Sequence, residues 1–560
     1  MYAIVVLIYK LQLVPKNIIQ TNLFGEMDQI CLSIEEAATV ANVSTATIRN
    51  WIKTGYLSLI SKGKIDSDSF KNFMKNVAGN EKLTQRANKL MKDEHDHVTL
   101  SGFIKNNDGS KSWAVVGKEY ECSLSNSYKN KEGIYYTPIE IIDDMLDGVS
   151  IQRDTKFLDP CCGSGNFIIQ AIKNGMLPEN VFGFDFDANA VEITKRRIFE
   201  ETGFDASENI TKVNFLEDAF KLQNERKYDL IFTNPPWGKK IAKKEKERYA
   251  MTYGAGTSID TTSLFYFASY RLLKEGGILG FLVQNALFNI GTFQDIRKHI
   301  LRNDLIRLID YDKPFKGLLT KAYAFVIKKN KPKKPSVDCN RIAGKHTRSQ
   351  FTFINNPKSI LNFWATKEES EVIEHIFSIP HKTLAGKAKW GLGVVTGNNS
   401  KFCISSYKQG YVPVFKGSDI TPTGLKSPTN FIPNDFSQYQ QVAPIELYQT
   451  EEKLIYKFIS SKLVFYCDTE QRFILNSANF LIPSKSLDVT CQQLADLLNS
   501  DVMNWLFTKL FDTHKILRGD IEQLPIHADY FSKHTSFDED TFINYLRLKK
   551  SEHGAYRFKE

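Results

Sequence analysis

Short apolar runs alternate with stretches of helical periodicity between residues 131 and 335. Buried strands are indicated by the apolar runs at 156–158, 181–187, 228–233 and 322–327. After the first run, Ile168, Ile169 and Ile172 recur at the spacing of one helix face. Strands that alternate with helices predict an α/β domain over this part of the chain.

A second block, residues 340–535, predicts a separate mixed α/β domain. Residues 390–399 and 415–420 combine short apolar runs with glycines, which indicates strands joined by tight turns. Residues 494–507 carry Leu and Trp at helical spacing and predict one amphipathic helix. Residues 536–560 are expected to form a C-terminal tail.

A small helical module is predicted at residues 31–76, after a poorly structured start and before a linker at 77–130 that contains a few short helices. Ser33 precedes a first helix with a carboxylate three positions on, and Ser44 precedes a second helix over 45–52. This pattern, with a short wing and a closing helix after it, resembles the helix-turn-helix of excisionase-type regulators.

That resemblance implies that the second helix of the module enters the major groove of DNA. Thr45, Thr47, Arg49 and Asn50 would then contact base edges or phosphates, whereas Ile48 and Trp51 are expected in the core. A helical hairpin docked on the main domain is the alternative interpretation.

The tetrapeptide Asn234-Pro235-Pro236-Trp237 directly follows the run at 228–233. Two prolines stiffen a turn and remove two backbone donors, so neighbouring carbonyls point out as acceptors. The Asn234 side-chain oxygen and the Pro235 carbonyl can both accept from one amino group, with Trp237 placed to stack on its ring. The turn suits the exocyclic amine of a purine or pyrimidine; an ordinary proline turn is the alternative.

A second turn joins the strand at 156–158 to the helix after it, and it contains Asp159, Gly163 and Gly165. Its glycines let a ligand approach the backbone closely, and the helix N-terminus offers free N–H groups. The third glycine of the dinucleotide fingerprint would fall at Ile168, so that fingerprint is absent. A carboxylate before the loop favours a cationic or amine-bearing ligand.

The strand at 181–187 ends in two carboxylates. Asp185 is placed as an acid that accepts hydrogen bonds from both hydroxyls of a ribose. Helix capping is the alternative role, for which Asp187 is the better placed of the two.

Together these residues resemble the DNA adenine-N6 methyltransferases of restriction–modification systems, over roughly residues 130 to 530. The motif order is similar to that of the gamma group, in which the cofactor motifs precede the catalytic motif and the target-recognition region comes last. The resemblance implies S-adenosyl-L-methionine as cofactor, a Rossmann-like catalytic domain at 131–335 and a target-recognition domain at 340–535.

The resemblance also implies roles for single residues. The cofactor-binding set comprises Tyr136, Thr137, Asp159, Gly163, Gly165, Phe167, Asp185 and Asp218. Asp218 fits the acid that contacts the cofactor adenine, with Asn214 as the alternative. Phe315 matches the aromatic that faces the flipped base, and a plain core role fits it equally well.

The mechanism implied by the resemblance needs neither a metal nor a covalent enzyme intermediate. The adenine is swung out of the duplex, because its amino group cannot be reached while it is paired. Asn234 and the Pro235 carbonyl hold that amino group, and Trp237 with Phe315 sandwiches the base. Alignment supplies most of the catalysis.

Length and charge agree with this interpretation. The 560 residues predict two or three domains, and a net charge of +9 is compatible with a polyanionic partner, here double-stranded DNA. Lys239 and Lys240 directly follow the catalytic turn, where a clamp on a DNA phosphate would help. A second basic run at 328–334 fits a solvated linker at least as well.

Eight cysteines form no CxxC pair, so neither a zinc site nor a disulfide framework is indicated, and a reducing, cytoplasmic setting follows. Residues 3–9 are apolar but too short to span a membrane. An over-long reading frame with initiation at Met27 is the preferred account of residues 1–26.

Three alternatives stay open beside adenine methylation. Cytosine-N4 methyltransferases use the same chemistry but usually carry Ser where Asn234 stands. The others are methylation of a glutamine side chain or of RNA, and a DNA-binding regulator with an inactive methyltransferase body. No nuclease-type acid–acid–lysine cluster is visible, so DNA cleavage would need a separate restriction endonuclease.

Overall fold

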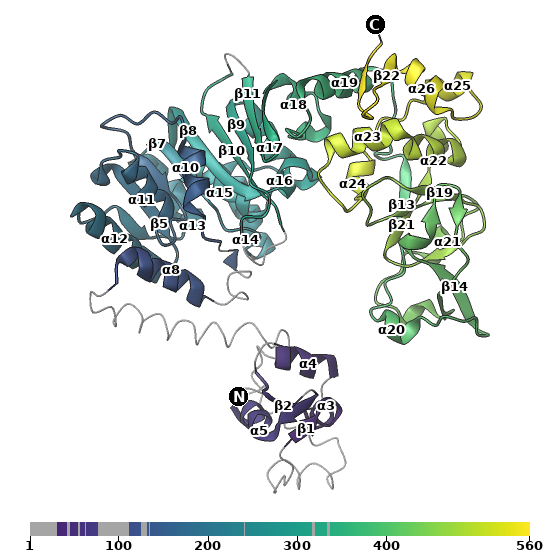
Figure 1. The fold of residues 1–560 in the computed structure, drawn as a ribbon, viewed down its shortest axis with the longest axis horizontal. Coiled ribbons are helices and arrows are strands. Elements are labelled where there is room, and N and C mark those ends of the chain that lie inside the picture. Colours follow the sequence, from purple (N-terminus) through teal and green to yellow (C-terminus); the bar gives the residue numbers. More distant parts are fainter. Residues whose placement is uncertain are drawn as a thin grey trace. The chain divides into compact units, whose positions relative to one another are not determined.

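Figure 1 shows the fold of the chain in a computed structural model. The structure describes residues 31–41, 45–53, 56–61, 63–76, 111–124, 132–133, 135–239, 241–315, 320–332 and 336–559. The start at 1–30, Met27, Lys240 and most of the expected linker lie outside the described residues. The described residues fall into two compact units: those within 1–136, 163–165 and 187–205 form one, and those within 137–162, 166–186 and 206–560 form the other.

The N-terminal module is built from three helices and a small antiparallel sheet of order β1-β3-β2. Its elements are β1 (Cys31–Ser33), α3 (Ile34–Ala41), α4 (Thr45–Lys53), β2 (Leu59–Ser61), β3 (Lys64–Asp66) and α5 (Ser67–Asn76). Ser33 and Glu36 exchange the two hydrogen bonds of a capping box, at 2.8 and 3.1 Å. Ile48 and Trp51 are buried, as predicted, so the module has its own core.

A helix forms within the segment expected to be a linker. α8 (Trp113–Ser123) packs on α12 (Ala188–Thr202). The Trp113 backbone N–H donates to Glu200 at 2.8 Å, and the Arg196 guanidinium lies 4.8 Å from the centre of the Trp113 ring. Tyr120 is buried beneath this pair of helices.

The larger unit contains a nine-stranded sheet of order β12-β11-β9-β10-β8-β7-β4-β5-β6 (Figure 1). The strands are β4 (Phe157–Asp159), β5 (Val181–Asp185), β6 (Ile210–Lys212), β7 (Tyr228–Thr233), β8 (Leu273–Gln284), β9 (Asp304–Asp310), β10 (Ala322–Lys328), β11 (Ser336–Arg341) and β12 (Gly344–Ser349). The five strands from β6 to β8 pair in parallel, and β10 inserts antiparallel between β8 and β9. The strand order therefore reverses its direction of growth at β4 and β7, where α/β sheets place their ligands.

Helices accompany this sheet and share its core, which is dominated by aromatic and aliphatic side chains. They are α10 (Ile139–Leu146), α11 (Asn166–Lys173), α13 (Phe215–Glu225), α14 (Lys243–Tyr253), α15 (Thr261–Leu272), α16 (Ala286–Asn289), α17 (Gln294–Leu301) and α18 (Phe351–Ile354). Gly280 lies against the Phe232 ring, which a Cβ there would approach to 2.4 Å, so β7 and β8 pack closely.

Among the described residues, the C-terminal region has two hydrophobic cores and small sheets of order β13-β21-β18-β19, β17-β14-β20 and β15-β16, besides a hairpin near the C-terminus. Its strands are β13 (Ala388–Leu392), β14 (Tyr411–Phe415), β15 (Ile420–Thr421), β16 (Gly424–Leu425), β17 (Phe431–Pro433), β18 (Lys453–Lys457), β19 (Phe465–Asp468), β20 (Phe473–Ile474) and β21 (Ala478–Pro483). Its helices are α19 (Lys367–Ser378), α20 (Asn399–Phe402), α21 (Ile445–Tyr448), α22 (Cys491–Asn499), α23 (Asp501–Leu510), α24 (Arg518–Ile521), α25 (Ala528–Lys533) and α26 (Glu539–Tyr545).

Two sequence expectations for this region need revision. The single helix over 494–507 is wrong, because Ser500 breaks it into α22 and α23 and its Oγ accepts from the Met503 N–H at 3.2 Å. Residues 536–560 contain α26 and the hairpin of β22 (Leu548–Lys550) and β23 (Tyr556–Phe558). Phe542 and Leu548 are fully buried, so these residues pack into the domain.

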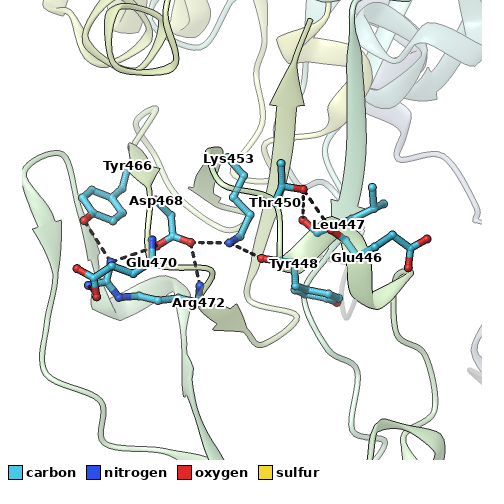
Figure 2. A network of polar contacts seen from close by, with 9 residues as sticks. All are labelled: Glu446, Leu447, Tyr448, Thr450, Lys453, Tyr466, Asp468, Glu470 and Arg472. Carbon is cyan, nitrogen blue, oxygen red and sulfur yellow. Dashed lines mark hydrogen bonds and ion pairs between the residues drawn. The ribbon is translucent and has the colours of Figure 1, made fainter.

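A buried ion pair links β18 to β19 in the C-terminal region (Figure 2). Lys453 Nζ and Asp468 Oδ2 are 2.5 Å apart, and both side chains are fully buried. The ammonium also donates to the Tyr448 carbonyl at 2.7 Å, and Arg472 Nη1 donates to the other carboxylate oxygen at 3.1 Å. Both charges are therefore compensated inside the core, which the burial of a charge requires.

Candidate active site

The ends of the neighbouring strands β4 and β7 are joined by a side-chain hydrogen bond. Thr233 Oγ1, on the last residue of β7, donates to Asp159 Oδ1 at 2.6 Å. The Cys161 backbone N–H donates to the same oxygen at 3.0 Å. The predicted cofactor carboxylate thus lies beside the strand end that begins the Asn234-Pro235-Pro236-Trp237 turn.

Asp159 sits in an environment that disfavours its charge. Only 1% of the residue is exposed, and burial raises the pKa of its carboxyl group to about 7. The hydrogen bonds from Thr233 and Cys161 oppose this shift, and the nearby charge of Asp185 adds to it. A cationic group placed next to Asp159 would favour the carboxylate.

The turn of Asn234 to Trp237, which is predicted to be catalytic, is well packed. Asn234 is half-buried and Pro235 is buried, while 3% of Trp237 is exposed. Trp237 Nε1 donates to the Leu282 carbonyl at 3.3 Å, which ties the turn to the adjacent strand β8. The ring of Phe315 lies 5.3 Å from that of Trp237 at an angle of 86°. The two aromatics predicted to sandwich a base are therefore perpendicular and in edge contact.

Asp185 ends β5 at the same edge of the sheet as Asp159. Asp187 caps α12, since its Oδ1 accepts from the Asn189 N–H at 2.9 Å, as predicted for the better cap of the two. Between them, Phe186 is 61% exposed, and the Lys239 ammonium lies 4.9 Å from its ring centre. An exposed aromatic thus stands directly after the predicted ribose acid.

The glycine turn adopts conformations that other residues rarely take. Gly163 has φ +53° and Gly165 has φ +89°, and a Cβ on Gly165 would lie 2.8 Å from the Thr194 side chain. Thr194 Oγ1 donates to the Gly163 carbonyl at 2.8 Å, and Arg197 Nη1 donates to the Ser164 carbonyl at 2.5 Å. Helix α12 therefore holds this turn through backbone carbonyls.

The other predicted cofactor residues are distributed around these elements. Tyr136 packs against Gly163, where a Cβ would approach its ring to 3.1 Å. Thr137 is buried, and its carbonyl accepts from Asn166 Nδ2 at 3.2 Å. Phe167 is buried in α11.

The two candidates for the contact with the cofactor adenine occupy different places. Asn214 directly follows the loop after β6 and forms the N-cap of α13, whereas Asp218 lies in the first turn of that helix. The alternative residue, Asn214, is thus nearer to the strand end.

The basic residues after the catalytic turn have mixed environments. Arg248 pairs with Glu217 at 2.6 Å, and Lys243 pairs with Glu247 at 3.6 Å. Lys239 lies over Phe186, close to the strand edge, and Lys240 is outside the described residues.

In the N-terminal module, Arg49 is exposed and lies 3.9 Å from Glu35. The side chain of Thr47 is outside the part that the structure describes.

Sequence reasoning did not assign a role to Thr233 or Phe186. Thr233 is a polar residue at the end of an apolar strand, immediately before the catalytic turn, and this position is a usable signal. Phe186 is an aromatic between two carboxylates at a strand end, which favours exposure at a site.

Comparison with known proteins identifies the family. Residues 111–381 match the N-6 DNA Methylase family, and residues 412–526 match the TaqI-like C-terminal specificity domain. The chain is 48% identical over 409 residues to the Type II methyltransferase M.VspI of Vibrio sp. (strain 343), which covers 72% of this chain and 100% of that protein. The chain belongs to the N-6 DNA methylase family. It is a DNA methyltransferase.

More distant relatives cover smaller parts of this methyltransferase. The MjaVIII methylase subunit of a type I restriction enzyme from Methanocaldococcus jannaschii is 24% identical, over 43% of this chain and 46% of its own. The solved DrdV–DNA complex matches with a TM-score of 0.51 and 13% identity, over 89% of this chain and 70% of that chain, which shows a shared fold.

The described helices include none with the length and apolar character needed to cross a bilayer.

Proposed function

We propose that this methyltransferase transfers a methyl group from S-adenosyl-L-methionine to the N6 amino group of an adenine flipped out of double-stranded DNA. The observation that carries the proposal is the hydrogen bond between Thr233 and Asp159. It brings the predicted cofactor carboxylate next to the Asn-Pro-Pro-Trp turn at the point where the sheet reverses its strand order. The catalytic domain is on this view Rossmann-like and of the gamma group.

The residues present fit such a cofactor. Asp159 offers a buried carboxyl group whose charged form a cationic ligand would favour, and Asp185 offers a second carboxylate one strand away. The exposed Phe186 ring suits an adenine face, and Asn214 or Asp218 suits its edge. S-adenosyl-L-methionine supplies an electrophilic methyl group when bound.

The side chains of the turn would then hold the substrate amine. Asn234 Oδ1 and the Pro235 carbonyl would accept hydrogen bonds from its two N–H groups, which points the nitrogen lone pair toward the methyl donor. Trp237 supplies a π-face for the base, and Phe315, set perpendicular to it, supports the Trp ring. Pro236 stiffens the turn between these contacts.

We propose further that the C-terminal region recognises the target sequence, in keeping with the match of residues 412–526 to a specificity domain. Lys239 and Lys240 would contact phosphates near the flipped base. A cognate restriction endonuclease would be a separate protein, since the similar M.VspI is named a Type II methyltransferase, and the methyltransferase itself is proposed to be cytoplasmic. The domain limits 31–76, 77–130, 131–335 and 340–535 belong to the same proposal, whereas residues 536–560 pack into the C-terminal region.

The N-terminal module is proposed as a helix-turn-helix that adds DNA affinity through α4. The exposed Arg49 on that helix supports the proposal.

Sequencing DNA from a host that expresses the chain, with detection of modified bases, tests the proposal. We expect N6-methyladenine at one short sequence, absent with Asn234→Ala. Detection of N4-methylcytosine in place of N6-methyladenine would identify cytosine as the substrate and overturn the assignment of adenine. DNA that stays unmodified while the enzyme methylates a protein or RNA would contradict the proposal.

A further inference from the structure

A polar cavity opens at the edge of the sheet that carries the catalytic turn. It has a volume of about 250 Å³. Its lining includes Asp310, Lys321, Tyr323, Arg341, Lys509 and Asp512. Three of these side chains are cationic and two are anionic, so the lining has a net positive charge.

The strand register places this cavity relative to the catalytic turn. Tyr323 on β10 pairs with Asp310 at the end of β9, and Arg341 ends β11, which runs parallel to β9. Tyr323 also pairs with Val283 of β8, and β8 lies next to β7, which ends at Thr233. Since neighbouring strands are about 4.8 Å apart, the near side of the cavity is roughly 10 Å from the catalytic turn.

Each charged group in the cavity already has a partner, and one of these partnerships crosses from the sheet to the C-terminal region. Lys321 Nζ lies 2.8 Å from Asp512 Oδ2, and the Tyr323 hydroxyl donates to the same oxygen at 2.5 Å. The side chains of Lys321 and Asp512 are 32% and 31% exposed. This pair is reachable from solvent and can exchange partners.

The remaining two cations carry more N–H donors than the contacts that the structure shows for them require. Arg341 Nη1 donates to the Trp364 carbonyl at 3.0 Å, and Lys509 pairs with Glu369 at 2.6 Å. The indole N–H of Trp364, which also lines the cavity, is buried and has no acceptor among the described residues. The lining is thus richer in hydrogen-bond donors than in unoccupied acceptors, which suits an oxyanion.

We propose that this cavity binds a backbone phosphate of the DNA substrate, and that the phosphate takes over Lys321 from Asp512. The proposal rests on DNA methylation as the function. Asp512 then acts as an internal competitor: it holds Lys321 in place before DNA arrives and limits the affinity for phosphates. The carboxylate of Asp310 faces the same cavity, and burial raises the pKa of this group above its usual value.

Substitutions of the cationic and the anionic residues of the cavity should change the DNA affinity of the full chain in opposite directions. Arg341→Gln and Lys321→Gln should each weaken binding of a labelled DNA duplex several-fold and lower the slope of log affinity against log salt by about 0.9. Asp512→Asn should instead tighten binding several-fold. Lys274→Gln is the matched control. Lys274 lies at the start of β8, on the opposite edge of the sheet, and forms a comparable half-exposed pair with Asp229. This variant should leave DNA binding unchanged.

Opposite signs for Asp512→Asn and Arg341→Gln would support the proposal, because a purely structural role would make both variants weaker. Equal losses in both, or wild-type affinity in both while the wild-type protein methylates DNA, would overturn the phosphate site alone. Inorganic phosphate that binds the protein without any effect of these variants on DNA affinity would also overturn it, in favour of a free-anion site. A wild-type protein that neither binds nor methylates DNA would overturn the proposed function as well.

Discussion

At Asp159, burial favours the protonated carboxyl group, whereas the proposed contact with a cationic cofactor favours the carboxylate. Burial raises its pKa from 3.8 to about 7, so the folded protein is most stable with this carboxyl group protonated. The stability that the neutral form contributes is fully present below the unfolded-state pKa and is lost as the pH rises through 7. A cationic cofactor reverses this preference, because it favours the carboxylate.

Cofactor affinity should therefore rise with pH. Below pH 7, binding of S-adenosyl-L-methionine must release a proton from Asp159, so affinity should increase up to about tenfold per pH unit and level off above pH 7. Calorimetry between pH 5 and 8 measures this. Asp159→Asn should bind weakly with a flat profile, and a wild-type profile that falls with pH would contradict the assignment.

Substitutions of Asn234 and Trp237 in the catalytic turn should affect different steps, methyl transfer and capture of the flipped base respectively. Asn234→Ala leaves Trp237 and the basic residues in place, so the variant should bind DNA while methyl transfer nearly vanishes. Trp237→Ala should weaken capture of the flipped base by ~1–3 kcal/mol, whereas Trp237→Phe keeps a π-face and should retain much activity. A fluorescent base analogue reports flipping apart from transfer. Near wild-type methylation by Asn234→Ala would remove the turn from the active centre.

Residue types and spacing predicted the residues of the candidate site. The residues that contact and position them could not be predicted in this way. Asp159 and Asn234 stand out because a carboxylate before a glycine turn and an amide before two prolines are unusual local chemistry. Thr233 looks like an ordinary strand residue, and its bond to Asp159 depends on β4 and β7 being neighbours across 74 positions of sequence. Such long-range pairing is set by the packing of the whole sheet.

At the scale of elements, the glycine turn after β4 should be intolerant of any side chain. Gly165→Ala would force φ +89° on a residue with a Cβ, at a cost of about 1–2 kcal/mol, and would press that Cβ against Thr194. We expect a lower melting temperature and weaker cofactor binding. Gly175→Ala is the control, because it has φ +99° but nothing within 4 Å of its Cβ. Equal effects of the two variants would mean that strain alone matters.

Elements with one strong signal were predicted well, whereas breaks within an apolar pattern were not. The run at 228–233 became β7 with the same limits, because a buried strand followed closely by two prolines has little freedom in where it ends. The helix over 494–507 was broken, since apolar periodicity continues across Ser500 while the backbone turns there. The pair Ser500 and Asp501 was a local signal for the start of a new helix. The prediction followed the hydrophobic spacing instead, which continues across this signal.

The ion pair between Lys453 and Asp468 should be essential to the C-terminal fold (Figure 2). Lys453→Met leaves the buried Asp468 carboxylate with Arg472 as its remaining cation, so we expect a loss of about 3–5 kcal/mol in the free energy of unfolding. Urea denaturation followed by fluorescence measures it. Lys550→Met, which removes a half-exposed pair with Asp501, is the control and should cost under 1 kcal/mol. A small loss with Lys453→Met would show that the pair is dispensable.

At the scale of the whole molecule, the N-terminal module has its own core and its own sheet, so it can be removed as a unit. The region that matches a specificity domain lies at 412–526, far from the module in sequence. Deletion of residues 1–80 should therefore lower DNA affinity and flatten its salt dependence, because phosphate contacts are lost with their released counterions. The methylated sequence should stay the same. Binding curves at several salt concentrations measure the affinity and its salt dependence, and sequencing of modified DNA identifies the methylated sequence. A changed target sequence would mean that α4 contacts bases, because phosphate contacts alone carry no sequence information.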